Sequence, residues 1–243
     1  EHVSHHVGMR TELVSESSYE SFSDDSYDVY FICSLPIVTF EREGISPTVP
    51  IAAPVVEGRR YGGLPIYFSD VIVHSSSNVE SLADLRGRSW CYNEPLSQSG
   101  YGITRHHLLR MGESPDFFGE VFPAGFHERS IEMVAEGIAD GSAIDSHLLT
   151  VELRERPELD QELKVIESLG PSTVQPMTVS KRLDPDLRAA IRAAILEFHL
   201  SDAGRSALAD GAIERWVPVG AKSYDDVRRM LEECHQARFM DIQ

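Results

Sequence analysis

The stretch SWCYNEPLSQSGYGI, residues 89–103, decides how this chain is expected to fold. The apolar residues near its start predict a buried strand over residues 88–93. Glu94-Pro95 ends the regular pairing, because proline donates no hydrogen bond and restricts the residue before it. The polar run 97–100 (SQSG) then leads directly into a helix, which predicts a strand–loop–helix unit of an α/β protein.

The same stretch predicts a site for an oxyanion. Two hydroxyls and several unpaired backbone N–H groups gather at a helix N-terminus, just beyond the carboxyl end of a strand, where open α/β sheets place their ligands. Gly100 allows the backbone to approach a ligand closely. The alternative is that Ser97 or Ser99 serves only as the N-cap of the helix. The chain holds no GxxxxGK motif, so this loop is not a nucleotide-binding P-loop.

Strand-like and helix-like segments alternate along most of the chain, which predicts mainly parallel sheets covered by helices. A polar start followed by Pro185 marks the clearest helix, with Asp184 as its N-cap. Strands are expected at residues 10–15, 28–33, 64–74, 88–93, 121–122, 141–145, 162–168 and 173–179, and helices at 78–87, 100–111, 127–137, 184–200, 201–209 and 225–237.

Four segments, in order and with similar spacing, resemble the periplasmic phosphate- and phosphonate-binding (PhnD-like) family. They are residues 81–90 (SLADLRGRSW), 94–102 (EPLSQSGYG), 121–146 (VFPAGFHERSIEMVAEGIADGSAIDS) and 187–198 (LRAAIRAAILEF). The resemblance implies the α/β type II periplasmic binding fold, in which two lobes enclose a ligand cleft. It places lobe 1 at residues 1–73 plus 178–243, without the family's usual first strand, and lobe 2 at residues 74–177, carrying the anion-binding loop.

The resemblance also implies which side chains contact the ligand. The S-x-S-G segment would hold the ligand's oxygens, and His127 stands at the family's histidine position. Gln175 stands where members that bind an aminoalkyl phosphonate have an acid, so a cationic ligand tail is not expected there, although the carboxylate of Asp145 remains available. The implied ligand-binding residues are Ser97, Gln98, Ser99, Gly100, Tyr101, His127, Asp145, Ser146 and Tyr67, with Ser69 beside Tyr67.

Composition excludes several other classes of function. The formal net charge is −17 and no basic cluster occurs, which argues against nucleic-acid binding. No run of about 18–20 apolar residues predicts a membrane span. Three cysteines without CxxC spacing argue against a disulfide scaffold or a structural zinc site. His2, His5 and His6 could share a helix face, but a solvated helix end is the favoured interpretation, and we predict no metal and no cofactor.

The favoured function is therefore a solute-binding protein that closes on a small oxyanion and delivers it to the permease of an ABC importer. The alternatives are an enzyme or a ligand sensor built on the same fold. An enzyme is less favoured: Ser99, His127 and Asp145 could form a catalytic set, but the chain has no GxSxG nucleophile motif. The protein is expected in the periplasm, or tethered outside the membrane if a signal peptide was removed, with the cytoplasm as the alternative.

Overall fold

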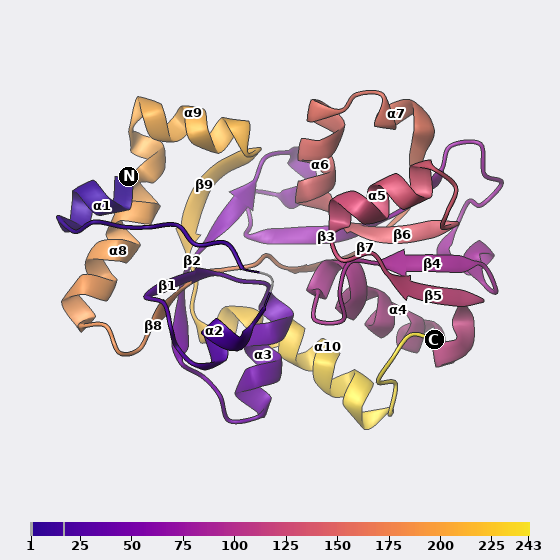
Figure 1. The fold of residues 1–243 in the computed structure, drawn as a ribbon, viewed down its shortest axis with the longest axis horizontal. Helices are drawn as coiled ribbons and strands as arrows, with labels where there is room; N and C mark the ends of the chain where they lie inside the picture. Colours follow the sequence, from indigo (N-terminus) through magenta and orange to yellow (C-terminus); the bar gives the residue numbers. More distant parts are fainter. Residues whose placement is uncertain (1, 17) are drawn as a thin grey trace. The chain divides into compact units, whose positions relative to one another are not determined.

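The computed structural model describes residues 2–16 and 18–243, which divide into two compact units (Figure 1). Unit 1 comprises Glu1–Ile66 and Thr173–Asp225, and unit 2 comprises Tyr67–Ser172 and Asp226–Gln243. The lobes expected from the sequence end at other residues. Above all, residues 226–243 belong to unit 2, because Met230, Phe239 and Ile242 lie in the hydrophobic core of that unit.

Unit 1 is built on a four-stranded sheet in the order β1 (Val29–Phe31), β8 (Met177–Ser180), β2 (Thr48–Val56), β9 (Ile213–Pro218). Each of these neighbouring pairs is antiparallel, so the expectation of mainly parallel sheets is wrong for this unit. A short apolar run such as 28–33 predicts a strand but does not encode the direction of its partner. Phe31, expected to be buried, is 62% exposed.

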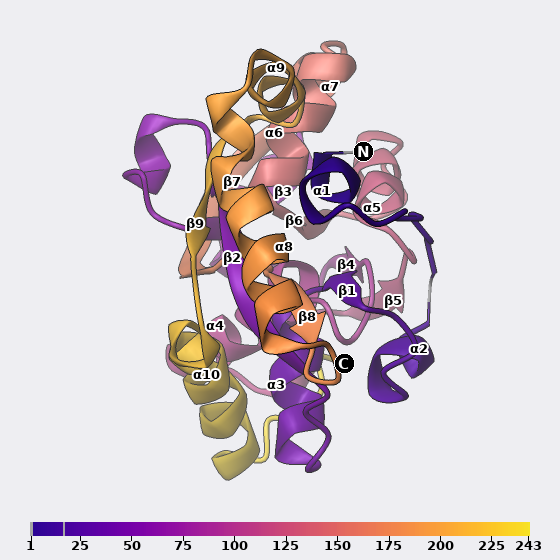
Figure 2. The same cartoon turned by 90° about the vertical axis from the view of Figure 1, so that its left-hand side faces the viewer.

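Helices cover both faces of this sheet. On one face α1 (His2–Val7) and α8 (Pro185–Glu197) pack over a core that includes Ile51, Val179 and Ile191 (Figure 2). On the other, Phe22 of α2 (Glu20–Ser23) packs with Tyr30 and Ile32, and with α3 (Ser34–Arg42). The remaining helix of the unit is α9 (Asp202–Asp210).

Unit 2 is built on a five-stranded sheet in the order β5 (Glu120–Pro123), β4 (Ser89–Tyr92), β6 (Gly141–Asp145), β3 (Ile66–His74), β7 (Leu163–Thr173). Strand β4 runs parallel to β5 and β6, whereas β3 is antiparallel to β6. The carboxyl ends of β4, β5 and β6 therefore meet at one edge of the sheet.

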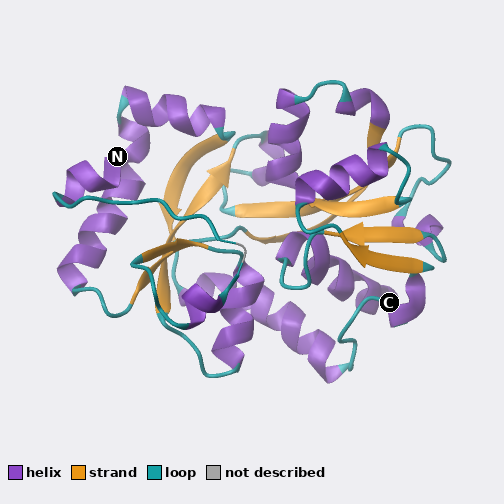
Figure 3. Cartoon of the chain, viewed as in Figure 1, coloured by secondary structure: helices purple, strands orange, loops and turns teal. Residues whose placement is uncertain are grey.

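Successive side chains of β4 point to opposite faces of the sheet, and each face carries a hydrophobic core of unit 2. Trp90 faces the core shared with α4 (Ile103–Met111) and α10 (Asp225–Gln236). Its neighbour Cys91 faces the core formed with α5 (His127–Ala135), α6 (Ser146–Glu155) and α7 (Leu159–Glu162), so helices lie on both faces of this sheet (Figure 3). Shorter 3₁₀ turns occupy Arg59–Tyr61, Leu82–Leu85, Pro115–Phe117, Phe198–Leu200 and Ala221–Tyr224.

Several predicted elements are confirmed and others are corrected. Helix α8 begins after Asp184, whose side chain accepts a hydrogen bond from the Asp186 N–H at 2.8 Å, and β6 spans the predicted residues. Residues 10–15 form no strand; Leu13 is 88% exposed, so the alternating pattern there buries nothing. The prediction did not include α3, α6, β2 and β9.

The structure also shows whether the described residues form membrane-spanning helices or metal sites. Within residues 2–16 and 18–243, no helix has both the length and the apolar character required to cross a bilayer. Over the same residues, no three histidine, cysteine or acidic side chains gather as a metal site, and this includes His2, His5 and His6.

Candidate functional site

The predicted anion-binding loop forms a tight turn at the carboxyl edge of the unit 2 sheet. The chain leaves β4 at Tyr92 and reaches a π-helical turn, Gln98–Gly102, which continues directly into α4. The helix thus begins two residues before the predicted start at Gly100. The Gly102 N–H donates to the Ser97 carbonyl at 2.9 Å, and the Gly100 N–H donates to Ser97 Oγ at 3.1 Å. Ser97 is therefore the N-cap, and its own hydroxyl proton is still available for donation.

The turn is anchored to the sheet beneath it. Ser69, fully buried on β3 opposite Asp145, donates its hydroxyl to the carbonyl oxygen of Ser99 at 2.5 Å. The Gln98 side chain donates to Ser172 Oγ at 3.2 Å and contacts the sulfur of Met230 at 3.3 Å. These contacts lie in the interior of unit 2, so the Gln98 side chain holds the turn in place.

Tyr101 likewise lies in the core. Its hydroxyl accepts a hydrogen bond from the Ile242 N–H at 3.0 Å, and its ring packs 4.8 Å from that of Tyr92. Burial raises the pKa of the Tyr101 phenol, so this group stays protonated. The side chains of Gln98 and Tyr101 thus anchor the turn. The resemblance implied that these residues contact the ligand, and this stays a prediction.

His127 lies beside the turn. It is the first residue of α5, and its Nε2 atom stands 3.1 Å from Ser99 Oγ. Its Nδ1 atom is buried and has no hydrogen-bond partner among the described residues. Burial lowers the pKa of His127 from its ordinary value of 6.5 to about 4, with no contribution from a neighbouring charge. The imidazole is therefore neutral at physiological pH.

Gly100 leaves no room for a side chain with its neighbours as they stand. A Cβ atom on residue 100 would stand 2.0 Å from Asn93 Oδ1 and 3.1 Å from His127 Cε1. Asn93 Oδ1 is also buried, and within the described chain it has no hydrogen-bond partner. Sequence reasoning missed Asn93; its signal was a polar residue directly after a buried strand that leads to the site.

The remaining predicted residues lie where β6 ends. Asp145 is the N-cap of α6, accepting hydrogen bonds from the His147 and Leu148 N–H groups at 2.8 and 3.4 Å. Ser146 Oγ accepts from the Phe68 N–H at 3.0 Å, and Tyr67 is almost fully buried on β3. The structure thus brings Ser97, Ser99, Gly100 and His127 together, and it gives Asp145 and Ser146 capping and bridging contacts.

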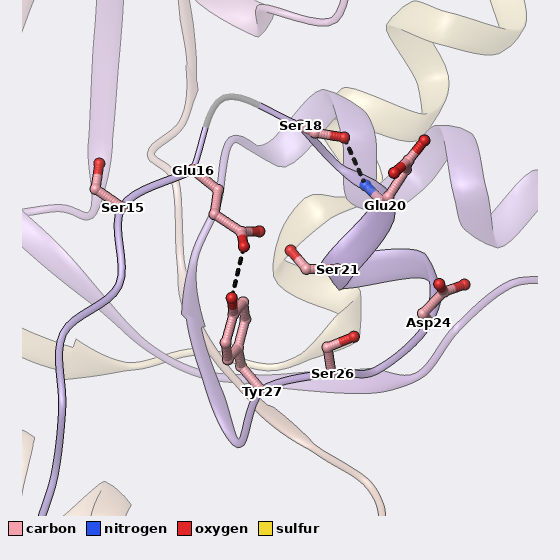
Figure 4. Close-up of a pocket in the computed structure, with 8 residues that line it drawn as sticks. All are labelled: Ser15, Glu16, Ser18, Glu20, Ser21, Asp24, Ser26 and Tyr27. Atoms are coloured by element: carbon pink, nitrogen blue, oxygen red, sulfur yellow. Dashed lines mark hydrogen bonds between the residues drawn. The ribbon is translucent and has the colours of Figure 1, made fainter.

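A surface hollow lies elsewhere, in unit 1 (Figure 4). The Tyr27 hydroxyl donates to Glu16 at 2.5 Å, and hydrogen bonds from Ser21 and Tyr27 lower the pKa of Glu16. The carboxylates of Glu16, Glu20 and Asp24 line this hollow and disfavour an anionic ligand there. The lining residues are Ser15, Glu16, Ser18, Glu20, Ser21, Asp24, Ser26 and Tyr27.

Comparison with known proteins identifies the class to which this architecture belongs. The family model for the periplasmic substrate-binding protein of phosphonate ABC transporters matches residues 1–224. The phosphate-import protein PhnD of Mycolicibacterium smegmatis is 23% identical over 253 residues, which covers 93% of this chain and 76% of that protein.

Two solved structures share the fold over nearly the whole chain. One is a binding-protein component of an ABC phosphonate transporter from Pseudomonas aeruginosa, with a TM-score of 0.83 and 18% identity, covering 98% of this chain and 79% of the other. The second is PhnD1 from Prochlorococcus marinus in complex with methylphosphonate, with a TM-score of 0.81 and 15% identity, covering 97% and 90%. The type II periplasmic binding fold predicted from the sequence is confirmed, and the chain belongs to the family of periplasmic substrate-binding proteins of phosphonate ABC transporters.

Proposed function

We propose that this protein binds a small phosphorus oxyanion at the turn formed by Ser97–Gly102. The observation that carries the proposal is that Ser99 lies at the N-terminus of a helix. Its carbonyl accepts a hydrogen bond from Ser69, and its hydroxyl lies 3.1 Å from His127 Nε2. Helix N-termini and hydroxyls stabilise oxyanions through neutral donors and the helix dipole. Such short-range donors suit a protein whose net charge of −17 repels anions at long range.

Phosphate and methylphosphonate are the ligands that we propose first. A similar protein from Mycolicibacterium smegmatis is a phosphate-import protein, and a structural neighbour was solved with methylphosphonate. Both ligands present tetrahedral oxygens that accept hydrogen bonds. Gln175 supplies no carboxylate for a ligand amine, which favours ligands without a cationic tail.

The same proposal gives the protein its partner and its place in the cell. Family membership implies delivery to the permease of an ABC importer, and we propose that this takes place in the periplasm. Binding without turnover is expected. The Ser99–His127 pair resembles the beginning of a catalytic set, but a histidine with a pKa of about 4 is a weak base near neutral pH.

A thermal-shift panel tests the proposal. Phosphate, phosphite, methylphosphonate, aminoethylphosphonate, sulfate and small carboxylates are added to the wild type and to the Ser97→Ala/Ser99→Ala variant. A ligand at about a hundred times its Kd stabilises the folded protein by about 2.7 kcal/mol. We expect stabilisation by at least one phosphorus oxyanion and its loss in the double variant. Stabilisation by carboxylates alone, or an equal shift in both proteins, would contradict the proposal.

The closing of the two units on the ligand stays a prediction. Three chain crossings, after Ile66, Ser172 and Asp225, connect the units, and binding proteins of this kind close by hinge motion in such segments. Small-angle X-ray scattering should show a smaller radius of gyration when a saturating phosphorus oxyanion is present. An unchanged radius under saturation would argue against closure.

A further inference from the structure

We propose that His127 is a positioning residue that acts on the ligand through Ser99: its Nε2–H group holds the Ser99 oxygen, so that the Ser99 hydroxyl proton is directed at an oxygen of the ligand. The proposal rests on the proposed function, because it assigns a role to His127 within the same site. It differs from the sequence-based expectation, in which His127 contacts the ligand itself.

The environment of the two ring nitrogens indicates which of them carries the proton. Nε2 lies 3.1 Å from Ser99 Oγ, whereas Nδ1 is buried without a partner among the described residues. In a neutral imidazole one nitrogen donates and the other accepts. A buried N–H without an acceptor is rarer in proteins than a buried acceptor without a donor. The proton is therefore assigned to Nε2, and Nδ1 is the bare acceptor.

This tautomer fixes the direction of the Ser99 hydroxyl. With Ser99 Oγ accepting from His127, the single hydroxyl proton must be donated to another group. The Ser99 backbone is also held to the sheet, because its carbonyl accepts the 2.5 Å hydrogen bond from Ser69. The hydroxyl is thus prepared for a partner that only accepts, and a deprotonated phosphoryl oxygen is such a partner.

Asn93 and His127 both lie next to Gly100. The side-chain oxygen of Asn93 and the Cε1 atom of His127 surround the space in which a Cβ of residue 100 would stand, at 2.0 and 3.1 Å. Asn93 Oδ1 and His127 Nδ1 are both buried acceptors without a donor.

Burial sets the protonation state of the His127 ring. It lowers the pKa of His127 to about 4, so the ring is neutral near pH 7. Ser99 Oγ lies 3.1 Å from Nε2 of the ring, and a Cβ on residue 100 would lie 3.1 Å from its Cε1 atom.

The first test needs no ligand. Two-bond ¹H–¹⁵N spectra of the histidine rings separate the Nε2–H tautomer from the Nδ1–H tautomer. We expect the His127 ring, assigned by comparison with His127→Gln, to remain neutral and in the Nε2–H form from pH 5.5 to pH 8. A Nδ1–H ring would overturn the proposal, because Ser99 would then donate to His127 and could not donate to the ligand.

The second test is a double-mutant cycle in binding affinity, measured by calorimetry with phosphate and methylphosphonate. Loss of one hydrogen bond to a charged group weakens binding by roughly 10- to 100-fold, and we expect this for Ser99→Ala and, in part, for His127→Leu. In the Ser99→Ala background, His127→Leu should add less than a factor of about two, because the group through which His127 acts is gone.

The conservative variant His127→Gln guards against a purely structural effect. Its amide N–H reaches the position of Nε2, so it should retain affinity within a factor of about three of the wild type. Two results would overturn the positioning role while leaving the proposed function intact. One is a double variant whose loss of affinity equals the product of the two single losses. The other is a His127→Gln protein that binds the ligand as weakly as His127→Leu does. Absence of wild-type binding to either ligand would refute the proposed function itself, and this inference with it.

Discussion

The Ser69 hydroxyl donates to the carbonyl oxygen of Ser99 at 2.5 Å, which joins the middle of β3 to the turn at the start of α4. Both residues are buried, and Ser69 lies opposite Asp145 in the register of β3 and β6. The turn is therefore fixed on the sheet by a side chain thirty positions earlier in the chain. A rigid backbone at this point keeps the Ser97 and Ser99 hydroxyls in place before any ligand arrives.

The hydrogen bond from Ser69 should contribute to ligand binding as well as to the stability of the fold. Ser69→Ala leaves the buried Ser99 carbonyl without its donor and should cost about 1–2 kcal/mol of unfolding free energy. Ser142→Ala is the matched control, because Ser142 on β6 donates to the Cys91 carbonyl at 2.8 Å and is equally buried. We expect similar losses in urea unfolding but weaker phosphate binding for Ser69→Ala alone. Equal affinities in the two variants would show that the anchor does not shape the site.

A side chain at residue 100 should displace Asn93 and disturb the turn. Gly100 lies in the π-helical turn and is not among the glycines with a positive φ, so the obstacle in Gly100→Ala is steric: the new methyl group would lie 2.0 Å from Asn93 Oδ1. Overpacking of this kind costs about 1–3 kcal/mol and shifts the surrounding groups. Gly220→Ala, where a Cβ meets nothing within 4 Å, is the control. Thermal unfolding and phosphate titration should show loss of both stability and affinity at Gly100 only; unchanged affinity there would contradict the described packing.

The Ser97 cap should matter for stability and for binding together. Ser97 Oγ accepts from the Gly100 N–H at 3.1 Å, and Ser201 Oγ accepts from the Gly204 N–H at 2.9 Å in the same manner at the start of α9. Loss of either cap should cost about 1 kcal/mol in chemical unfolding. Calorimetry should then show weaker phosphate binding for Ser97→Ala and unchanged binding for Ser201→Ala. If both variants bind as the wild type does, Ser97 is a cap only.

Acid should weaken the fold partly through His127. Its pKa is lowered in the folded protein to about 4 from an ordinary value of 6.5, so between these values the unfolded chain binds more protons than the folded one. Stability contributed by the neutral ring is complete above about pH 6.5 and is lost as the pH falls toward 4, by on the order of 3 kcal/mol.

Urea unfolding of the wild type and His127→Gln at several pH values isolates this contribution. The stability of the wild type relative to the variant should fall as the pH is lowered from 7.5 to 4.5. His5→Gln, a change at an exposed residue of α1, is the control and should leave the pH dependence unchanged. A difference between wild type and His127→Gln that stays constant with pH would mean that His127 is not held neutral by burial.

Local signals in the sequence predicted much of the fold. Asp184 and Pro185 mark the start of α8, and the buried run 141–145 lies between a glycine and a carboxylate, so it forms β6 as expected. The strand–turn–helix unit at 89–111 was predicted for the same reason, because proline, serine and glycine impose local geometry there.

Features set by distant partners could not be predicted in this way. The antiparallel direction of β1 depends on β8, almost 150 residues later, and residues 226–243 join unit 2 through Met230, Phe239 and Ile242. Gln98 and Tyr101 became anchors because Ser172 and Ile242 lie beside them, contacts with no trace in the local pattern. The same holds for Asn93, whose side-chain oxygen lies next to Gly100.

The central claim, that an oxyanion binds at the turn, is tested most directly by mapping amide chemical shifts during a phosphate or methylphosphonate titration. Our account predicts that the largest saturable ¹H–¹⁵N shifts fall on residues 97–103 and on His127, and that they disappear in Ser97→Ala/Ser99→Ala. Saturable shifts that leave residues 97–103 unmoved and gather elsewhere, for instance around the hollow at residues 15–27, would contradict it.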